Sequence, residues 1–160
     1  MESLAGSGRN VCTTKAALAV GTTTTLTTGA VQYFSIKGKG YTKAATSNEA
    51  SPTLDSNTGV AFLPVPVGYG SVFTICRDSG AALRAVQGEI VALDSSELFT
   101  HLPQRAGVPN TLAPIGCVTV KVGLSGAAWT FGSSNFAGPP TDVVFVFTDF
   151  IGGQPSRPTL

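Results

Sequence analysis

The sequence predicts an all-β fold, in the form of an antiparallel β-sandwich or jelly roll with short hairpins and at most one short helix. Nineteen Gly and ten Pro interrupt the 160-residue chain at short intervals. The segments between them have the length of strands and are rich in Val, Thr, Phe, Tyr and Ile. No long segment carries apolar residues at helical spacing. Roughly eight strands joined by loops favour antiparallel layers over a parallel α/β sheet.

The chain divides by composition into three parts. Residues 1–10 are small, polar and rich in Gly and Ser, which is typical of a flexible N-terminal arm. Residues 11–151 form a single β-sandwich domain, and residues 152–160 form an extended C-terminal tail. A chain of this size buries roughly 68–70% of its unfolded surface, which is enough for one core without staples.

The first clear structural signal is a hairpin. Residues 30–37 form one strand, residues 38–40 (Gly-Lys-Gly) turn the chain, and residues 41–44 return. Before the hairpin, the Thr-rich residues 22–28 are extended, since β-branched side chains lose rotamer freedom in a helix. After it, residues 45–57 have the Ser, Thr, Asn and Pro content of a surface loop.

Strands resume at residues 60–63, and two prolines that follow belong at an edge or an end because they cannot donate to a ladder. Residues 71–77 and 82–93 are apolar runs on either side of Asp-Ser-Gly, which predicts a second hairpin. Within it, Gly88 marks a β-bulge.

Residues 95–104 are the one place for a short helix, capped by a serine and stopped by Pro103. The remaining strands are expected at residues 115–122, 127–131 and 143–150.

The core is expected around the largest apolar side chains. Trp129 and Phe131 share one strand face. Because burial of a Trp side chain contributes strongly to the free energy of folding, we expect Trp129 in the core rather than exposed for ligand stacking. Residues 143–147 are continuously apolar, which predicts cover on both faces, by a second sheet and by a loop, a helix or a neighbouring subunit. Cys12, Cys76 and Cys117 are odd in number and widely spaced, which indicates free thiols, and the latter two are expected to be buried.

The composition excludes several partners. Charged residues make up 12% of the chain, about half the usual quarter, and the net charge is +1. Such a neutral surface favours contact with other protein surfaces. The basic residues are scattered, which argues against nucleic acid, and Lys37, Lys39 and Lys43 are interpreted as a solvated hairpin. No apolar run approaches the roughly 20 residues that span a bilayer, and no targeting segment is visible, so we expect a protein made in the cytoplasm and no membrane partner.

No residue type or spacing points sharply to catalysis. The single histidine, His101, would need a nucleophilic partner for catalysis, and the sequence has no Gly-x-Ser-x-Gly elbow to supply a serine. We therefore interpret His101 as structural. Glu89, Asp94 and Glu97 lie close in sequence, and a glycosidase would need two such carboxyls across a cleft, a pairing that the sequence leaves open. We expect no enzyme and assign no catalytic residue.

Residues 55–59 (Asp-Ser-Asn-Thr-Gly) have the oxygen-rich opening of a calcium loop. The pattern fails downstream, because Val60 stands where the loop needs Gly and Pro66 where it needs Glu. A polar turn built on Asx hydrogen bonds is expected instead. We therefore assign no metal ligands and no cofactor.

Four stretches carry a family resemblance, namely residues 36–43 (IKGKGYTK), 52–59 (PTLDSNTG), 128–135 (AWTFGSSN) and 155–158 (PSRP). With their order and the chain length, they make the sequence similar to capsid decoration, or cement, proteins of tailed bacteriophages. The resemblance implies a jelly-roll-like β domain, present in many copies as dimers or larger assemblies. It implies a place on the capsid exterior of the virion, where the domain clamps neighbouring subunits of the major capsid protein.

Two other functions fit the same composition. A tail-tube or tail-fibre β-module would form rings or trimers at the tail. A carbohydrate-binding surface module would need an exposed row of aromatic side chains, for which Tyr33, Tyr41 and Tyr69 are the candidates.

Overall fold

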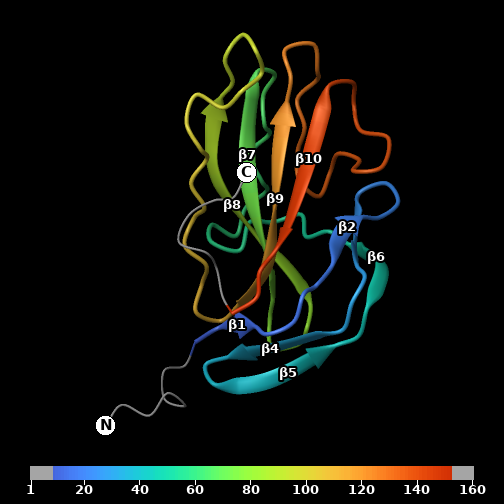
Figure 1. Cartoon of the computed structure of the whole chain (residues 1–160), viewed down its shortest axis with the longest axis vertical. Coiled ribbons are helices and arrows are strands. Elements are labelled where there is room, and N and C mark those ends of the chain that lie inside the picture. Colours follow the sequence, from blue (N-terminus) through green and yellow to red (C-terminus); the bar gives the residue numbers. More distant parts are fainter. Residues whose placement is uncertain (1–8, 153–160) are drawn as a thin grey trace.

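The computed structural model describes residues 9–152, and in this part of the chain it is all-β, with no helix (Figure 1). Within residues 9–152, ten strands form three antiparallel sheets, which confirms the predicted fold class of a β-sandwich. In spatial order the large sheet holds β10 (Val143–Asp149), β9 (Ala113–Val122), β7 (Tyr69–Arg77) and β8 (Leu83–Ala92). One small sheet holds β1 (Val11–Cys12), β4 (Gln32–Ile36) and β5 (Lys39–Lys43), and the other holds β2 (Leu18–Val20), β3 (Thr25–Thr28) and β6 (Thr46–Ala50).

The four long strands stand upright in Figure 1, and the two small sheets lie below and to the right of them. The central strands β7 and β9 are buried along almost their whole length. This is why their sequences are nearly continuous apolar runs rather than alternating ones.

The core contains a cluster of aromatic rings between the large sheet and the loops opposite it. Trp129 and Phe131 are fully buried, as predicted, and pack against Phe73 of β7 with ring centroids 6.0 and 4.8 Å away. Phe136 lies 5.1 Å from Trp129 and tilts against Phe145 of β10. Offset and edge-to-face contacts of this kind add to the stabilisation that burial supplies.

The strands predicted at residues 60–63 and 127–131 are wrong. Ala61 forms only an isolated bridge to Leu54, and Trp129 only a bridge to Val65. The two hydrogen bonds between Val65 and Trp129, of 2.8 and 3.0 Å, are the whole of that pairing. Prolines beside Val65 cannot donate to a longer ladder, so ring packing holds the segment instead.

The first hairpin is confirmed, but its turn lies one residue earlier than predicted. Ile36 pairs with Lys39, so the turn is Lys37-Gly38. Both turn residues have positive φ, of 52° and 79°. Positive φ at both central positions defines a type I′ turn, whose twist matches that of the flanking strands and which the Gly accommodates without strain.

The predicted surface loop at residues 45–57 contains β6, which pairs with β3. The polar composition of the segment hid this strand, because an edge strand exposed on one side needs few apolar residues. The extended segment at 22–28 is shorter than predicted. Thr25 donates to the Thr22 carbonyl across 3.0 Å in a turn, and only Thr25–Thr28 form β3.

The second hairpin, between β7 and β8, is confirmed together with its bulge. Ser71 pairs with Ile90 and Phe73 with Gln87, so Gly88 and Glu89 both stand opposite Val72. A Cβ added at Gly88 would lie 2.8 Å from Val72 Cγ1, which explains the glycine.

The short helix predicted at residues 95–104 is wrong. Asp94 Oδ1 accepts hydrogen bonds from the backbone N–H of Ser96 and Leu98, at 2.8 and 3.0 Å, and so closes a tight turn. Beyond the turn Phe99 bridges back to Leu93. A side chain that bonds to its own turn competes with the helix that the cap and spacing suggested.

Most of the predicted N-terminal arm and C-terminal tail lie outside the described residues. Of the arm, Asn10 donates through Nδ2 to the carbonyls of Asn110 and Leu112, at 2.7 and 2.8 Å. Of the tail, Gly152 donates to the Cys12 carbonyl across 2.8 Å. Within residues 9–152 there is no helix long and apolar enough to cross a membrane.

Candidate functional site

His101 and Glu89 lie together on the surface. His101 Nε2 is 3.1 Å from Glu89 Oε1, and Glu89 Oε2 accepts from the Gln104 backbone N–H at 3.2 Å. These hydrogen bonds, chiefly that to His101, hold the pKa of Glu89 below its usual range. In the described part of the chain no hydroxyl or thiol joins the pair, so its visible role is to fasten the loop after β8 to the bulge.

Asp94 and Glu97, the two carboxylates that lie near Glu89 in the sequence, accept hydrogen bonds in separate turns. Asp94 closes the turn described above, and Glu97 Oε1 accepts from the Leu124 N–H at 3.0 Å. The Glu97 carbonyl also accepts from Lys121 Nζ at 3.1 Å. Among residues 9–152 no three His, Cys, Asp or Glu side chains are grouped to hold a metal ion.

The polar turn expected at residues 55–59 is confirmed. Asp55 Oδ1 accepts from the Asn57 N–H at 2.7 Å, which is an Asx turn. Asp55 Oδ2 accepts from the Gln87 N–H of β8 at 3.3 Å. The oxygen-rich sequence therefore holds the loop against the sheet edge.

The three lysines of the first hairpin do not act as one cluster. Lys37 and Lys39 are exposed near the turn, and Lys39 Nζ lies 5.6 Å from the Tyr41 ring centroid. Lys43 points instead to Glu49, with Nζ 3.8 Å from Oε1. The arrangement agrees with a solvated hairpin.

The three tyrosines do not share a surface. Tyr41 stacks on Phe34, directly across the hairpin, at a centroid distance of 5.6 Å. Tyr33 neighbours Phe34 in β4, so its side chain points to the opposite face. Tyr69 lies in β7 of the large sheet. These residues therefore form no aromatic row.

All three cysteines are free and buried, which confirms the prediction for Cys76 and Cys117. Burial raises the pKa of each thiol, most strongly at Cys76, which is enclosed on all sides. A thiol with a raised pKa has little reactive thiolate at neutral pH.

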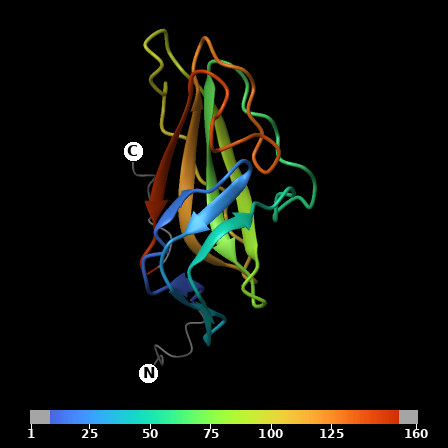
Figure 2. The same ribbon diagram turned by 90° about the vertical axis from the view of Figure 1, so that its right-hand side faces the viewer.

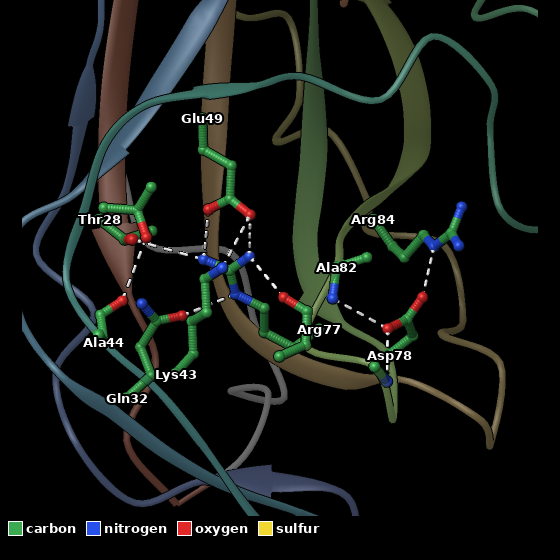
Figure 3. A network of polar contacts seen from close by, with 12 residues as sticks. Thr28, Gln32, Lys43, Ala44, Glu49, Arg77, Asp78, Ala82 and Arg84 are labelled. Carbon is green, nitrogen blue, oxygen red and sulfur yellow. Dashed lines mark hydrogen bonds and ion pairs between the residues drawn. The ribbon is translucent and has the colours of Figure 1, made fainter.

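A buried arginine, which the sequence analysis did not predict, joins the three sheets (Figure 3). Arg77, at the end of β7, has no exposed surface. Its Nη1 and Nη2 donate to the two carboxylate oxygens of Glu49 in β6, at 2.6 and 2.7 Å. Its Nε donates to Gln32 Oε1 of β4 at 2.9 Å.

Two more acceptors complete the arginine's environment, namely the Ala81 carbonyl at 3.0 Å and Thr28 Oγ1 at 3.4 Å. A guanidinium has five N–H groups, so each one has an acceptor. A fully satisfied buried cation is structurally stable but has no free donor for a ligand. We interpret this cluster as a structural joint.

The two edges of the large sheet differ sharply. Backbone and side-chain groups from loops cover the β8 edge. They do so through the hydrogen bonds Ser56 N–H to Ala85 O (2.9 Å), Gln87 N–H to Asp55 Oδ2 (3.3 Å), Glu89 N–H to Gln104 O (2.8 Å) and Thr100 N–H to Ala92 O (3.1 Å). No second chain can extend the sheet on this side without displacing them.

The β10 edge is open. On either side of β10, Asp142 O accepts from the N–H of Gly123 at 2.8 Å, and the Phe150 N–H donates to the Ile115 carbonyl at 3.0 Å. In this register the N–H and C=O groups of the even-numbered residues of β10 face β9. By the alternation of antiparallel ladders, the N–H and C=O groups of Val143, Phe145 and Phe147 point away from β9. Among residues 9–152 no group hydrogen bonds to them. In Figure 2 β10 (red) runs along the left margin of the ribbon.

Apolar side chains surround this edge on the outer face of the sheet. Val144 and Val146 are 50% and 43% exposed, so the cover predicted for both faces of this strand is missing from one face of the single chain. Val146 lines an apolar hollow of about 440 Å³ with Leu98, Phe99, Leu102, Thr119 and Lys121.

A second apolar surface lies on the other side of the sheet, beside the bulge of β8. Val60 and Leu63 are 61% and 63% exposed there, and they border a hollow of about 450 Å³ with Ala61, Gly88 and Ile90.

Comparison of the chain with protein-family models, curated proteins and solved structures finds no match.

Proposed function

We propose that the chain is a structural virion protein that binds the outer surface of a phage head and cements neighbouring major capsid subunits. The domain is proposed to be a jelly-roll-like module, made in the host cytoplasm and assembled onto the capsid exterior. The observation that carries the proposal is the pair of apolar surfaces on a weakly charged exterior, one at Leu98 and Leu102 and one at Val60 and Leu63. A clamp needs two separate protein-binding surfaces.

The physical properties of the domain suit such a clamp. A standard protein interface buries roughly 1,600 Å² in total, and several weaker contacts repeated around a shell reach high avidity. The buried Arg77 joint holds the small sheets rigidly to the large one, so little ordering entropy is lost when the domain binds.

The direct test is gentle dissociation of the native particle by low salt or heat. A cement protein leaves while the shell stays closed, and the stripped shell then breaks at a lower temperature. Release together with tails would instead support the tail-module alternative, and failure to find the chain in any particle would refute a virion role.

Surface variants identify the contacts in a rebinding assay on stripped heads. Leu98→Glu and Leu63→Glu each place a charge on one apolar surface and should weaken rebinding at least about tenfold, through unpaired charge in the interface. Val31→Glu, at a valine that is 42% exposed elsewhere on the domain, is the matched control and should rebind normally. Normal rebinding of both surface variants would show that neither hollow contacts the capsid.

A further inference from the structure

We propose that the open β10 edge pairs with β10 of a second copy of this chain, in an antiparallel two-fold dimer whose large sheet is continuous across both copies. This inference does not depend on the proposed location on a phage head. It follows from the unequal protection of the two sheet edges and from the sequence of β10.

An open edge of this length is a strand-pairing surface. Along the strand, the N–H and C=O groups of Val143, Phe145 and Phe147 have no hydrogen-bond partner among residues 9–152, whereas loops cover the opposite edge at β8. Proteins that keep such an edge free usually place charges or Pro on it or break it with a bulge. Residues 143–148 contain no charge and no Pro, and the β9–β10 register runs without a shift.

The covered β8 edge decides the symmetry. Head-to-tail stacking of copies would require β10 of one copy to pair with β8 of the next, and that edge is occupied by its own loops. Within residues 9–152 the large sheet has one free edge, so a large sheet that is continuous across copies forms only when like edges meet, and that pairing closes after two copies. The edge thus favours a dimer over a ring or a filament.

The strand is complementary to itself. Self-pairing places each residue near its own kind, which is unfavourable for charged residues but not for the uncharged residues 143–148 of β10. The outward-facing residues must pair with one another, and centring the two-fold axis on Phe145 achieves this by placing Val143 opposite Phe147 of the second copy. Asp149 stays outside the pairing, where its Oδ1 already accepts from the Leu18 N–H at 3.0 Å.

The same register covers the exposed valines. Val144 lies beside Val146 of the second copy, and this contact occurs twice around the axis. Because Val146 also lines the apolar hollow with Leu98 and Leu102, the hollows of the two copies come to lie near each other. The second copy supplies the missing cover on the outer face of β10.

The first test is the oligomeric state of the isolated chain, by sedimentation or by size exclusion with light scattering over a range of concentrations. We expect a dimer. Val146→Lys should weaken it by about tenfold, since two symmetric valine pairs are lost. Val31→Lys, at a valine with nearly the same exposure (42% against 43%), should leave the dimer intact. Thermal unfolding of each variant checks that it folds.

The second test reads the register directly. In the double variant Val144→Cys plus Val146→Cys, the new thiol at position 144 of one copy faces the new thiol at position 146 of the other. The Cα atoms of this non-hydrogen-bonded pair lie about 4.5 Å apart, which is within reach of a disulfide. Mild oxidation should cross-link this variant and neither single variant. The native cysteines are buried and supply a low background.

Two results would overturn the proposal. One is a chain that stays monomeric at all concentrations and whose double-cysteine variant does not cross-link, which would show that copies do not pair through this edge. The other is a dimer that Val146→Lys and Val31→Lys affect equally, which would place the interface elsewhere. Neither result bears on whether the chain binds a phage head.

Discussion

The Arg77 guanidinium grips the Glu49 carboxylate through two parallel hydrogen bonds, with Nη1–Oε1 and Nη2–Oε2 distances of 2.6 and 2.7 Å. The arginine is fully buried and the Glu49 side chain is 16% exposed. The two residues belong to different sheets, so this ion pair is a tertiary contact.

Removal of the acid should be severe. We expect Glu49→Ala to lower the free energy of unfolding by about 3–5 kcal/mol, because the arginine is left buried with its charge uncompensated. The surface pair Arg84–Asp78, with Nε–Oδ2 at 2.9 Å and the arginine side chain half exposed, is the control. Arg84→Ala should cost about 0–1 kcal/mol. If urea unfolding showed the same loss of unfolding free energy in Glu49→Ala and Arg84→Ala, the buried ion pair would not have the stabilising role assigned to it.

Acid should loosen the tip of the second hairpin. Partial burial raises the pKa of Asp78, but hydrogen bonds from the Ala82 and Gly80 N–H groups and from Arg84 outweigh it, and the pKa is lowered. A carboxyl whose folded-state pKa is lowered contributes stability that is present above its unfolded pKa, near 3.8, and lost as the pH falls through the folded value.

The matched variant for this effect is Asp78→Asn, which keeps the shape but not the charge. At pH 7 it should be less stable than the wild type by about 1 kcal/mol. The difference should shrink as the pH falls below about 4. Urea unfolding of both proteins from pH 7 to pH 2 measures it, and a difference that does not change with pH would rule out the charge as the cause.

Gly70 makes room for the loop that crosses the outer face of the sheet. A Cβ at this position would collide with the Phe99 ring and lie 2.7 Å from the Val120 carbonyl. Gly70→Ala should therefore destabilise by about 1–3 kcal/mol, as overpacking does. Gly40→Ala is the control, because nothing lies within 4 Å of its added Cβ.

The two glycine variants also differ in where they disturb the fold. In Gly70→Ala, amide chemical shifts should move around Phe99 and in the turn closed by Asp94. In Gly40→Ala they should move only near the first hairpin. Unchanged shifts at Phe99 in Gly70→Ala would show that the sheet, not the loop, gives way.

The thiols should report on unfolding. Cys12, Cys76 and Cys117 are buried, and burial raises their pKa values. A disulfide reagent at neutral pH should modify none of them in the native protein and all three in urea. Fast reaction of one thiol under native conditions would reveal local opening around that residue.

The sequence predicted best the strands whose two faces are both buried. Residues 71–77 and 115–122 were expected as strands and lie within β7 and β9, and the bulge at Gly88 was also expected. Continuous apolar runs bounded by Gly and turn residues carry their own signal, because burial on both faces dictates composition directly.

Polar segments carried a weaker signal. Thr46–Ala50 has the composition of a loop and becomes β6 by pairing with β3. The segment after Asp94 has the cap and spacing of a helix, but Asp94 bonds to its own turn and Phe99 fills the space above Gly70. In both cases distant contacts override local preference.

The joint and the open edge could not be derived from the chain. Arg77 ends an apolar strand, a position where an arginine is usually exposed, and Glu49 lies 28 residues earlier in a polar segment. β10 is an edge strand because of the spatial order of the strands in the large sheet. The sequence predicts where each strand lies along the chain but not this spatial order.

The Arg77 joint also bears on how the molecule unfolds. The two small sheets have three short strands each and limited cores of their own. They cannot separate from β7 without breaking the hydrogen bonds that Arg77 makes to Gln32 and Glu49. Opening of a small sheet therefore breaks hydrogen bonds of Arg77 as well as that sheet's packing on the common core. The amides of β3, β4 and β6 should exchange with solvent at the rate of the whole domain, as a single cooperative unit rather than as fraying flaps.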